Sequence, residues 1–482
     1  MKSAEKRLSK ITTTLSGPRA RFYAFAVFFV LVFFTGGGSR DDIQSLVLLR
    51  PLAVLFCAYA LVVRIPAQWT GRQFPLYILA ALMALMLLQL LPLPASVWTQ
   101  LPERMIFADI ADMVGLEQSW RPLTLTPSRT LNSLFALAVP LAATMLYLNL
   151  DREGRKKVIP VIIILCVISA IWATFQIVGP ASGPLYTYRI TNVGIGVGLF
   201  ANRNHQAIML VSGIVLLGWY AASRKSNDKQ APLKFYGGLA TILIFVPLIF
   251  ITGSRAALLL MVPALALALY LVNYGRYQMR LTSGGNDSKG KNASWTLSQK
   301  LPLLVGIFAI VGIVASSILL SRSLAFDRLF SGGDVEELRF QLLPTLFAML
   351  KDYMPWGSGF GSFEHVYRIH EPQELLRSSY LNQAHNDWLQ FPIEGGIPAL
   401  LIVLVATSWF VKGLWILIKN WRGSSTTCYR SLACIAVILF LLASSIGDYP
   451  LRVPSLMAIF TVLVCIFHDG TPSIQQRDIN RL

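Results

Sequence analysis

Long apolar runs separated by short polar connections extend over most of the chain. A helix needs about 20 mostly apolar residues to span a bilayer. Such runs lie at 21–36, 45–63, 74–94, 131–149, 158–179, 205–222, 235–252, 256–274, 301–320, 397–418, 431–447 and 455–468. This pattern predicts an all-α polytopic membrane protein with about 12 transmembrane helices.

The composition supports a membrane protein over a soluble one. The 482 residues are 55% hydrophobic and only 14% charged, and the mean hydropathy is +0.58. Soluble domains are nearer to a quarter charged. A net charge of +18 would by itself fit a nucleic-acid partner. The basic residues, however, gather in short connections between apolar runs, as topology signals do, so we expect no nucleic acid.

The distribution of Lys and Arg predicts the topology. If the N-terminus is inside, the inner connections hold most of these residues, notably at 152–157, 224–234 and 276–300, as the positive-inside rule expects. Segment 1–20 is a basic tail without a convincing cleavage site, so 21–36 is expected to be a retained first span. Both termini are then cytoplasmic.

Two predicted outer connections are long. Segment 95–130 contains Trp98, Trp120 and several prolines, and we expect it to lie along the membrane surface. Segment 321–396 follows the ninth span and precedes the tenth. The sequence thus predicts a large periplasmic loop between helices 9 and 10.

Within the large loop, 334–353 has the spacing of an amphipathic helix. Pro344 lies inside it and is expected to kink or split the helix. The glycines at 357, 359 and 361 then predict a turn-rich stretch. The apolar positions of the helix are Leu338, Leu342, Leu346, Phe347 and Leu350.

The first candidate for chemistry is Asn202-Arg203-Asn204-His205, at the predicted outer end of the sixth span. Asn is a favoured helix cap, so the motif places an arginine beside unpaired backbone N–H groups. Such a helix start suits a phosphate group. The alternative is an interfacial arginine that anchors the helix among lipid headgroups.

The second candidate is Thr252-Gly253-Ser254-Arg255, between two apolar runs. Gly253 permits a tight turn and Ser254 is placed to cap the eighth span. Arg255 lies in the first turn of that span, and arginines close to apolar surroundings are often functional. Snorkelling to the interface is the alternative. Two such arginines on one predicted face would suit a diphosphate, and Arg339 in the large loop is a third candidate cation.

His385, in Ala384-His385-Asn386-Asp387-Trp388-Leu389, is the candidate base. An unperturbed imidazole titrates near neutral pH and is suited to taking a proton from a hydroxyl. From spacing alone, a structural loop histidine is the alternative. Asp387 would point elsewhere on a helix and is a doubtful partner. His365 and His370 are interpreted as surface residues.

The remaining polar features favour structural roles. Asp448 and Arg452, in the last outer turn, are interpreted as an interfacial ion pair, and a place in the lining of the pocket is the alternative. The five cysteines form no CxxC motif, and no metal-binding spacing such as HExxH occurs. We therefore expect no disulfide, no metal site and no cofactor.

At these residues the chain resembles the O-antigen ligase and polymerase family of bacterial membrane glycosyltransferases. The resemblance covers approximately 180–450. It rests on Phe200-Ala201-Asn202-Arg203-Asn204-His205, Thr252-Gly253-Ser254-Arg255-Ala256, Pro355-Trp356-Gly357-Ser358-Gly359-Phe360-Gly361 and the segment 384–389, which occur in the family's order. Arg203 stands where many members have another residue between the two asparagines.

The resemblance implies a metal-independent, inverting glycan transfer on the periplasmic side of the bacterial inner membrane. The donor would be a glycan on undecaprenyl diphosphate and the acceptor a sugar hydroxyl. Arg203 and Arg255, with Arg339 as a helper, would bind the diphosphate, and His385 would be the general base. The expected supporting residues are Asn202, Asn204, His205, Ser254 and Asn386.

The predicted organisation follows from these assignments. Residues 1–20 form the cytoplasmic tail and 21–179 the first five spans. Residues 180–450 form the catalytic region, including the periplasmic loop 321–396, and 451–482 hold the last span and a cytoplasmic tail.

Several functions remain open from the sequence. A polymerase would extend a lipid-linked repeat of O-antigen or exopolysaccharide, whereas a ligase would act on lipid A–core; we favour the polymerase. Twelve spans also fit a polysaccharide flippase or secondary transporter, although such proteins usually show repeat symmetry. A metal-dependent transferase using Asp41 and Asp42 is a further alternative.

Overall fold

Helices account for most of the chain, as the apolar pattern predicts. The computed structural model describes residues 15–116, 118–223, 230–282, 334–376, 380–420 and 426–470. In this part, nine helical segments are long and apolar enough to cross a membrane, and two shorter apolar helices are present. Each predicted run except 301–320 therefore has a helix, and 301–320 lies outside the described residues.

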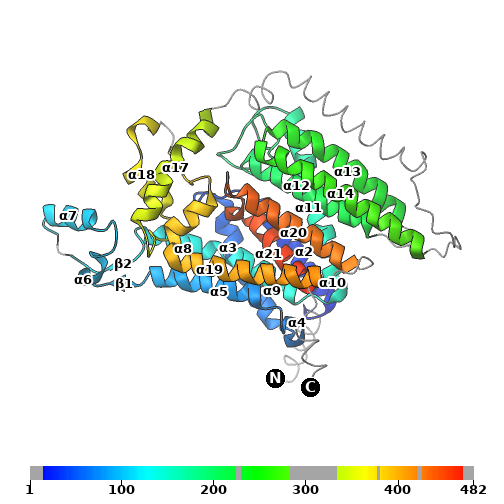
Figure 1. Ribbon diagram of the computed structural model, residues 1–482, viewed down its shortest axis with the longest axis horizontal. Helices are drawn as coiled ribbons and strands as arrows, with labels where there is room; N and C mark the ends of the chain where they lie inside the picture. The colour runs from blue at the N-terminus through cyan, green and yellow to red at the C-terminus, as the bar shows by residue number, and fades with distance from the viewer. Residues whose placement is uncertain are drawn as a thin grey trace, which may run out of the picture. The chain divides into compact units, whose positions relative to one another are not determined.

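The helices fall into two compact units. Unit 1 comprises Met1–Asp151, Gly333–Asn420 and Leu442–Leu482, and unit 2 comprises Arg152–Gly332 and Trp421–Leu441. The chain leaves unit 1 for unit 2 and returns, so residues distant in the sequence meet inside each unit (Figure 1).

Unit 1 is built around α9 (Ala138–Leu148), which is buried along almost its whole length. It packs against four apolar helices because its own residues are apolar on every face. These neighbours are α2 (Pro18–Thr35), α3 (Ser45–Val62), α5 (Phe74–Gln89) and α21 (Pro454–Gly470). The short helices α4 (Pro66–Trp69) and α8 (Pro127–Ala136) belong to the same unit.

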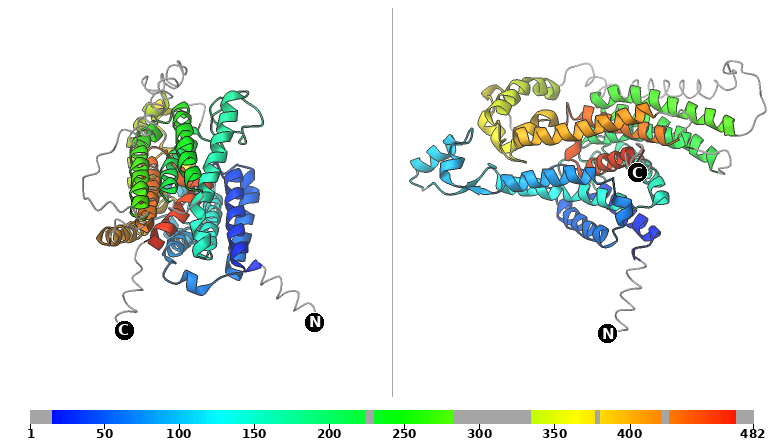
Figure 2. Two further views of the ribbon diagram at one scale, coloured as in Figure 1. Left: turned by 90° about the vertical axis from the view of Figure 1, so that its right-hand side faces the viewer. Right: turned by 60° about the horizontal axis from the view of Figure 1, so that its bottom comes forward.

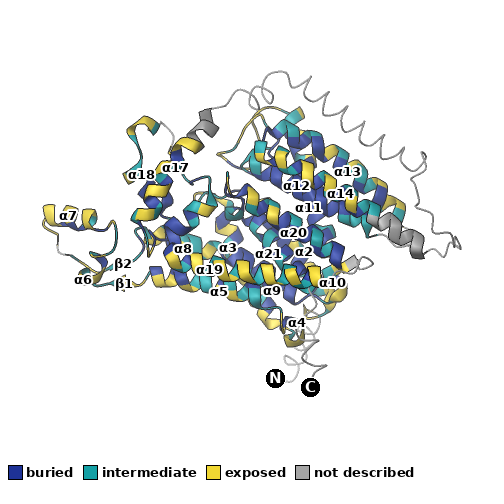
Figure 3. Cartoon of the chain, in the orientation of Figure 1, coloured by how far each residue is buried: buried dark blue, intermediate teal, exposed yellow. Residues whose placement is uncertain are grey.

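Unit 2 is built around α12 (Arg203–Ala222). Most residues of this helix are buried, which Figure 3 shows in dark blue. A β-carbon on Gly218 would lie 2.6 Å from the Ala268 Cα, so the small residue permits a close approach to α14. The other helices of the unit are α10 (Arg152–Lys156), α11 (Val158–Val178), α13 (Ala231–Thr252) and α14 (Arg255–Thr282). Helix α20 (Thr426–Ser444) contributes most of its length to this unit.

The segment 95–130, which the sequence predicts to be an outer connection, carries structure that the sequence does not predict. It contains α6 (Ala95–Trp98) and α7 (Met105–Met113), and Pro92–Leu93 (β1) pairs antiparallel with Arg121–Pro122 (β2). In both Figure 1 and the right view of Figure 2, α7 projects beyond the end of α5. The expectation that this segment lies along a membrane surface stays a prediction.

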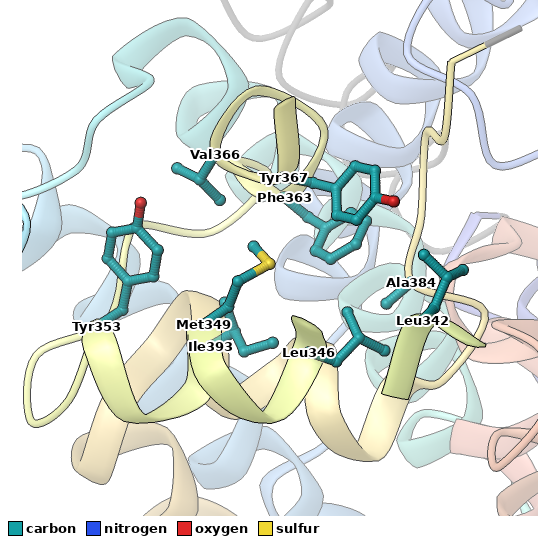
Figure 4. Close-up of a cluster of buried hydrophobic side chains, with 9 residues drawn as sticks. All are labelled: Leu342, Leu346, Met349, Tyr353, Phe363, Val366, Tyr367, Ala384 and Ile393. Atoms are coloured by element: carbon teal, nitrogen blue, oxygen red, sulfur yellow. The ribbon is translucent and has the colours of Figure 1, made fainter. Parts of the chain in front are cut away.

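The described part of the segment 321–396 contains α17 (Asp334–Asp352), α18 (Phe363–His370) and a 3-10 turn at Gln373–Leu375. Helix α17 runs unbroken through Pro344, so the expected split at this residue is wrong. The predicted buried face is confirmed for Leu342 and Leu346, whereas Phe347 is exposed. Figure 4 shows the resulting apolar cluster, formed by Leu342, Leu346, Met349, Tyr353, Phe363, Val366, Tyr367, Ala384 and Ile393.

Truncation of Met349 is expected to loosen this cluster. Its side chain is 0% exposed, and a buried Met→Ala change costs about 2–5 kcal/mol. Met349→Ala should lower the thermal midpoint of the purified protein and raise amide hydrogen exchange in 342–367. Phe347→Ala is the matched control, since Phe347 is 56% exposed. Equal exchange in both variants would show that the cluster does not hold this segment.

Candidate functional site

His385 lies on the turn that leads into α19 (Asp387–Lys419). The helix begins ten residues before the predicted tenth span, and Asn386 is its N-cap. The Asn386 side chain accepts a hydrogen bond from the Leu389 N–H at 3.2 Å. His385 itself has φ +51°, a conformation that costs a non-glycine residue about 1–3 kcal/mol. The turn therefore holds the imidazole in one direction at the expense of local strain.

The backbone on both sides of His385 is anchored within unit 1. The Asp387 N–H donates to the Ser445 carbonyl at 2.9 Å, and the Trp388 indole N–H donates to the Leu442 carbonyl at 3.0 Å. Before the histidine, the Ala384 N–H donates to the Gln390 side chain at 2.8 Å. The first two bonds fix the start of α19 against the C-terminal end of α20 and the residue that follows it.

The His385 ring meets a carboxylate on its Nδ1 side. Nδ1 lies 3.5 Å from Asp448 Oδ1, and the two side chains are 18% and 5% exposed. The Tyr449 ring centroid lies 4.8 Å from that of the imidazole. A carboxylate beside Nδ1 favours the tautomer with its proton there, which leaves the Nε2 lone pair for accepting a proton. Asp448, and not Asp387, is thus the acidic neighbour of this histidine.

Arg452, in the 3-10 turn Pro450–Arg452 that precedes α21, connects this turn to α19. Its Nε lies 2.7 Å from Asp387 Oδ1 and its Nη2 lies 3.3 Å from Glu394 Oε2. The expected pairing of Asp448 with Arg452 is therefore wrong, because each residue contacts a group on the α19 side. Burial disfavours the Arg452 charge, but the Glu394 and Asp387 carboxylates outweigh burial and raise the pKa of the guanidinium.

Sequence reasoning did not assign Glu394 to the site, and it gave Asp448 and Arg452 a place there only as the less favoured alternative. One signal was present for Glu394: it is an acidic residue directly before the apolar run of the tenth span. Charged residues in such surroundings are costly and are usually paired. The partner could not be found from sequence, since it lies in a different outer turn.

Helix α19 is interrupted at Gly396, where φ is 62° and ψ is −158°. The Ile397 N–H donates to the Pro355 carbonyl, and the Ile393 carbonyl accepts from the Ser358 N–H instead. Position 398 is a proline and has no N–H to donate to the Glu394 carbonyl. The break thus exchanges bonds within the helix for bonds to segment 355–359.

The segment 357–361, which contains three glycines, makes further hydrogen bonds to the α19 backbone beside this break. The Glu394 carbonyl accepts from the Gly359 N–H at 2.9 Å and from the Gln89 side chain at 3.0 Å. Gly357, Gly359 and Gly361 all have positive φ, which confirms the predicted turns. The segment thus supports the first stretch of α19, residues 387–395, which follows His385 and the cap Asn386.

The 95–130 segment packs on the other side of these glycines. The Leu125 N–H donates to the Ser358 carbonyl at 3.0 Å, and the Thr130 hydroxyl donates to the Phe360 carbonyl at 2.8 Å. A β-carbon on Gly359 would lie 1.9 Å from Thr124 Oγ1. Burial lowers the pKa of Arg104 to about 10, and its guanidinium donates to the Leu123 carbonyl. The two outer segments therefore form one packed support.

In unit 2, Asn202 caps α12 as predicted. Its side chain accepts from the Asn204 N–H at 2.9 Å, and the Arg203 N–H donates to the Asn192 side chain at 3.0 Å. His205 is buried in the first turn of the helix. Arg203 and Asn204 are partly exposed at the helix start, where the positive end of the helix dipole favours an anion.

The second arginine motif meets the first inside unit 2. Arg203 Nη1 donates to the Thr252 carbonyl at 3.2 Å. Gly253 has φ +62° and ends α13, and the Ser254 carbonyl accepts from the Leu258 N–H in the first turn of α14. Arg255 is the first residue of that helix. The structure thus brings the two arginine-bearing helix starts together, with Arg203 stabilising the C-terminus of α13 between them.

The other candidates lie elsewhere. Arg339 belongs to α17, and its side chain lies outside the described residues. His365 accepts from Arg129 at 3.3 Å, and His370 lies 3.2 Å from the Tyr353 hydroxyl. Neither of these two histidines is exposed as expected; both are partly buried.

The acidic pair 41–42 is engaged by arginines. Arg129 Nη1 lies 2.5 Å from Asp41 Oδ2, and Arg40 Nε lies 3.0 Å from Asp42 Oδ1. In the part of the chain that the structure describes, no group of three or more His, Cys, Asp or Glu side chains is arranged around a common point for a metal ion.

Comparison with protein families gives a match to O-antigen ligase over residues 239–404. The matched part runs from α13 to the middle of α19 and contains Arg255 and His385. The match confirms the resemblance to the O-antigen ligase and polymerase family that the motifs predict. A comparison with curated proteins gave no match to the chain.

Proposed function

We propose, from the O-antigen ligase match over 239–404, that this protein is a membrane glycosyltransferase that acts on lipid-linked glycans. The donor is a glycan on undecaprenyl diphosphate and the acceptor is a sugar hydroxyl. The protein resides in the bacterial inner membrane, with both termini in the cytoplasm and transfer on the periplasmic side. The observation that carries the proposal is the 3.5 Å contact between His385 Nδ1 and Asp448.

In the proposed reaction, His385 Nε2 takes the proton of the acceptor hydroxyl as that oxygen attacks the anomeric carbon of the donor. A new C–O bond forms on the opposite face from the leaving group, so the configuration is inverted. The bond between the anomeric carbon and the diphosphate oxygen breaks, and its electron pair leaves with the lipid diphosphate. Asp448 stabilises the imidazolium, which later returns its proton to solvent.

The arginines of unit 2 have an electrostatic role in this proposal. Arg203 and Arg255 bind the diphosphate and stabilise the charge that develops as it leaves, assisted by the helix starts that carry them. Arg339 is proposed as a further cation, while Asn202, Asn204 and Ser254 shape these helix starts. No metal ion takes part in the proposed step.

We expect Arg255→Ala to lower kcat/KM for transfer by roughly 10²–10³-fold, as the loss of a group that stabilises developing charge does. Arg203→Ala should lower kcat/KM by a smaller factor, because Arg203 Nη1 already donates a hydrogen bond to the Thr252 carbonyl. Arg368→Ala is the control, since Arg368 is an exposed arginine paired with Glu364, and such pairs contribute about 0–1 kcal/mol. If Arg368→Ala and Arg255→Ala lowered kcat/KM equally, the assignment of Arg255 to diphosphate binding would be wrong.

The proposed function is tested by transfer with purified protein in liposomes. The donor is an undecaprenyl-diphosphate-linked glycan, offered with a lipid-linked repeat unit or with lipid A–core, in the presence and absence of a chelator. Polymerisation of the repeat is the expected result, and transfer only to lipid A–core would identify a ligase instead. Loss of transfer in chelator would support the metal-dependent alternative. Movement of the glycan across the bilayer without transfer would support a flippase.

A further inference from the structure

A largely buried charged network of Arg452, Asp387 and Glu394 lies beside His385, with the Arg452 and Asp387 side chains 21% and 13% exposed. The Glu394 side chain is 0% exposed, and Gln390 Nε2 also donates to its Oε1 at 2.9 Å. Removing such charges from water costs several kcal/mol each, and well-packed apolar residues are often as stable in their place. Stability alone therefore gives a poor account of this network.

The network spans the two parts of unit 1 that carry the proposed base and its acidic neighbour. Asp387 is the first residue of α19 and follows His385 by two positions, whereas Arg452 follows Asp448 by four. Glu394 lies at the other end of the short helical stretch that precedes the break at Gly396. One guanidinium thus holds both ends of this stretch to the turn that contains Asp448.

The geometry requires an arginine in particular. Arg452 Nε donates to Asp387 Oδ1 at 2.7 Å, while Nη1 and Nη2 both lie 3.3 Å from Glu394 Oε2. A guanidinium presents these donors in one rigid plane, so two fixed carboxylates determine its orientation. A lysine would supply the charge without this constraint. Asp387 Oδ2 is buried with no hydrogen-bond partner among the described residues, so Arg452 is the group that holds this carboxylate.

We propose that Arg452 is a positioning residue for the base: it fixes His385 against Asp448 by locking the start of α19 to the last outer turn. The proposal rests on the proposed function, because it concerns the same transfer step. Arg452 acts through His385 and takes no proton itself. Its loss should therefore reduce the rate of the chemical step more than the binding of donor.

The first test compares Arg452→Lys with the triple variant Arg452→Gln/Asp387→Asn/Glu394→Gln, which removes the guanidinium charge and both of its carboxylate partners together. Both variants should be recovered folded, with a thermal midpoint close to that of the wild type. We expect kcat to fall by on the order of 10²-fold, as small misplacements of catalytic groups do, with the KM for donor changed less than about twofold. Wild-type kcat in folded Arg452→Lys would overturn the proposal.

The second test introduces Arg452→Lys into a His385→Ala protein. If Arg452 acts through His385, the substitution should have no further effect on the residual rate, because residues that act as a unit are non-additive. A further loss equal to that in the wild-type background would show an independent or purely structural role. If His385→Ala itself transferred at the wild-type rate, the proposed base would fail, whatever the Arg452 variants did.

Discussion

His385→Ala is expected to reduce glycan transfer by about 10²–10⁴-fold while the protein remains folded and inserted. General acid–base catalysis contributes rate enhancements of this size. The imidazole is the proposed base, and its Nδ1 lies 3.5 Å from Asp448 Oδ1. The side chain makes no contribution to the cap of α19, which comes from Asn386. Alanine is smaller than histidine, so the substitution adds no steric clash at the strained φ of residue 385. Initial rates at saturating donor and acceptor measure the loss.

Two companion variants distinguish a base from a structural histidine. His365→Ala is the matched control: the partly buried His365 lies in the same segment but contacts Arg129 and not the His385–Asp448 pair, so its loss should leave transfer within about twofold of the wild type. Asp448→Asn should lower kcat by an intermediate amount, since the neutral amide no longer stabilises an imidazolium or selects its tautomer. An active His385→Ala protein would exclude the histidine as base.

Gly396→Ala is expected to disrupt the start of α19 and with it the transfer activity. Its φ of 62° and ψ of −158° lie in a region that essentially only glycine adopts. A β-carbon there would also lie 2.2 Å from the Pro355 carbonyl oxygen, which is the acceptor of the Ile397 N–H. Strain and clash together should cost more than about 3 kcal/mol and lower the yield of folded protein, its thermal midpoint and its rate.

Gly115→Ala separates the two causes. Gly115 has a similar φ of +68°, but no atom lies within 4 Å of the place that its β-carbon would take. This variant should therefore show only the conformational cost, about 1–2 kcal/mol. Comparable thermal midpoints for the two variants would mean that the contact between Gly396 and segment 355–357 is unimportant for stability. Near-normal transfer by folded Gly396→Ala would show that the break in α19 is not needed to hold His385.

The helices and their caps could be predicted because the signals are local. Apolar runs of about 20 residues must satisfy their backbone groups internally in a bilayer, so they form helices. The start of α12 at Asn202 and the turn at Gly253 follow from the chemistry of an amide cap and of glycine. Local reasoning left a kink or a split open at Pro344, and packing of the α17 face on the cluster of Figure 4 keeps one continuous helix.

The neighbours of His385 could not be predicted in the same way. Asp448, Arg452 and Glu394 were visible as charges, but their pairing depends on which outer turns are adjacent, and several pairings satisfy the same sequence. The break at Gly396 likewise depends on carbonyls and N–H groups offered by segment 355–359. Such exchanges become favourable only when the segments are in contact, since an unmade buried hydrogen bond costs about 1–3 kcal/mol.

The sequence by itself therefore determined the helical membrane architecture, the two arginine-bearing helix starts and the candidate base, because periodicity, capping and residue chemistry act over a few positions. The tertiary structure decided that Arg203 reaches the turn before Arg255, that Asp448 is the acidic neighbour of His385, and that Arg452 holds α19 at both ends of its first stretch. These contacts join residues far apart in the chain, and their geometry is set by packing within each unit.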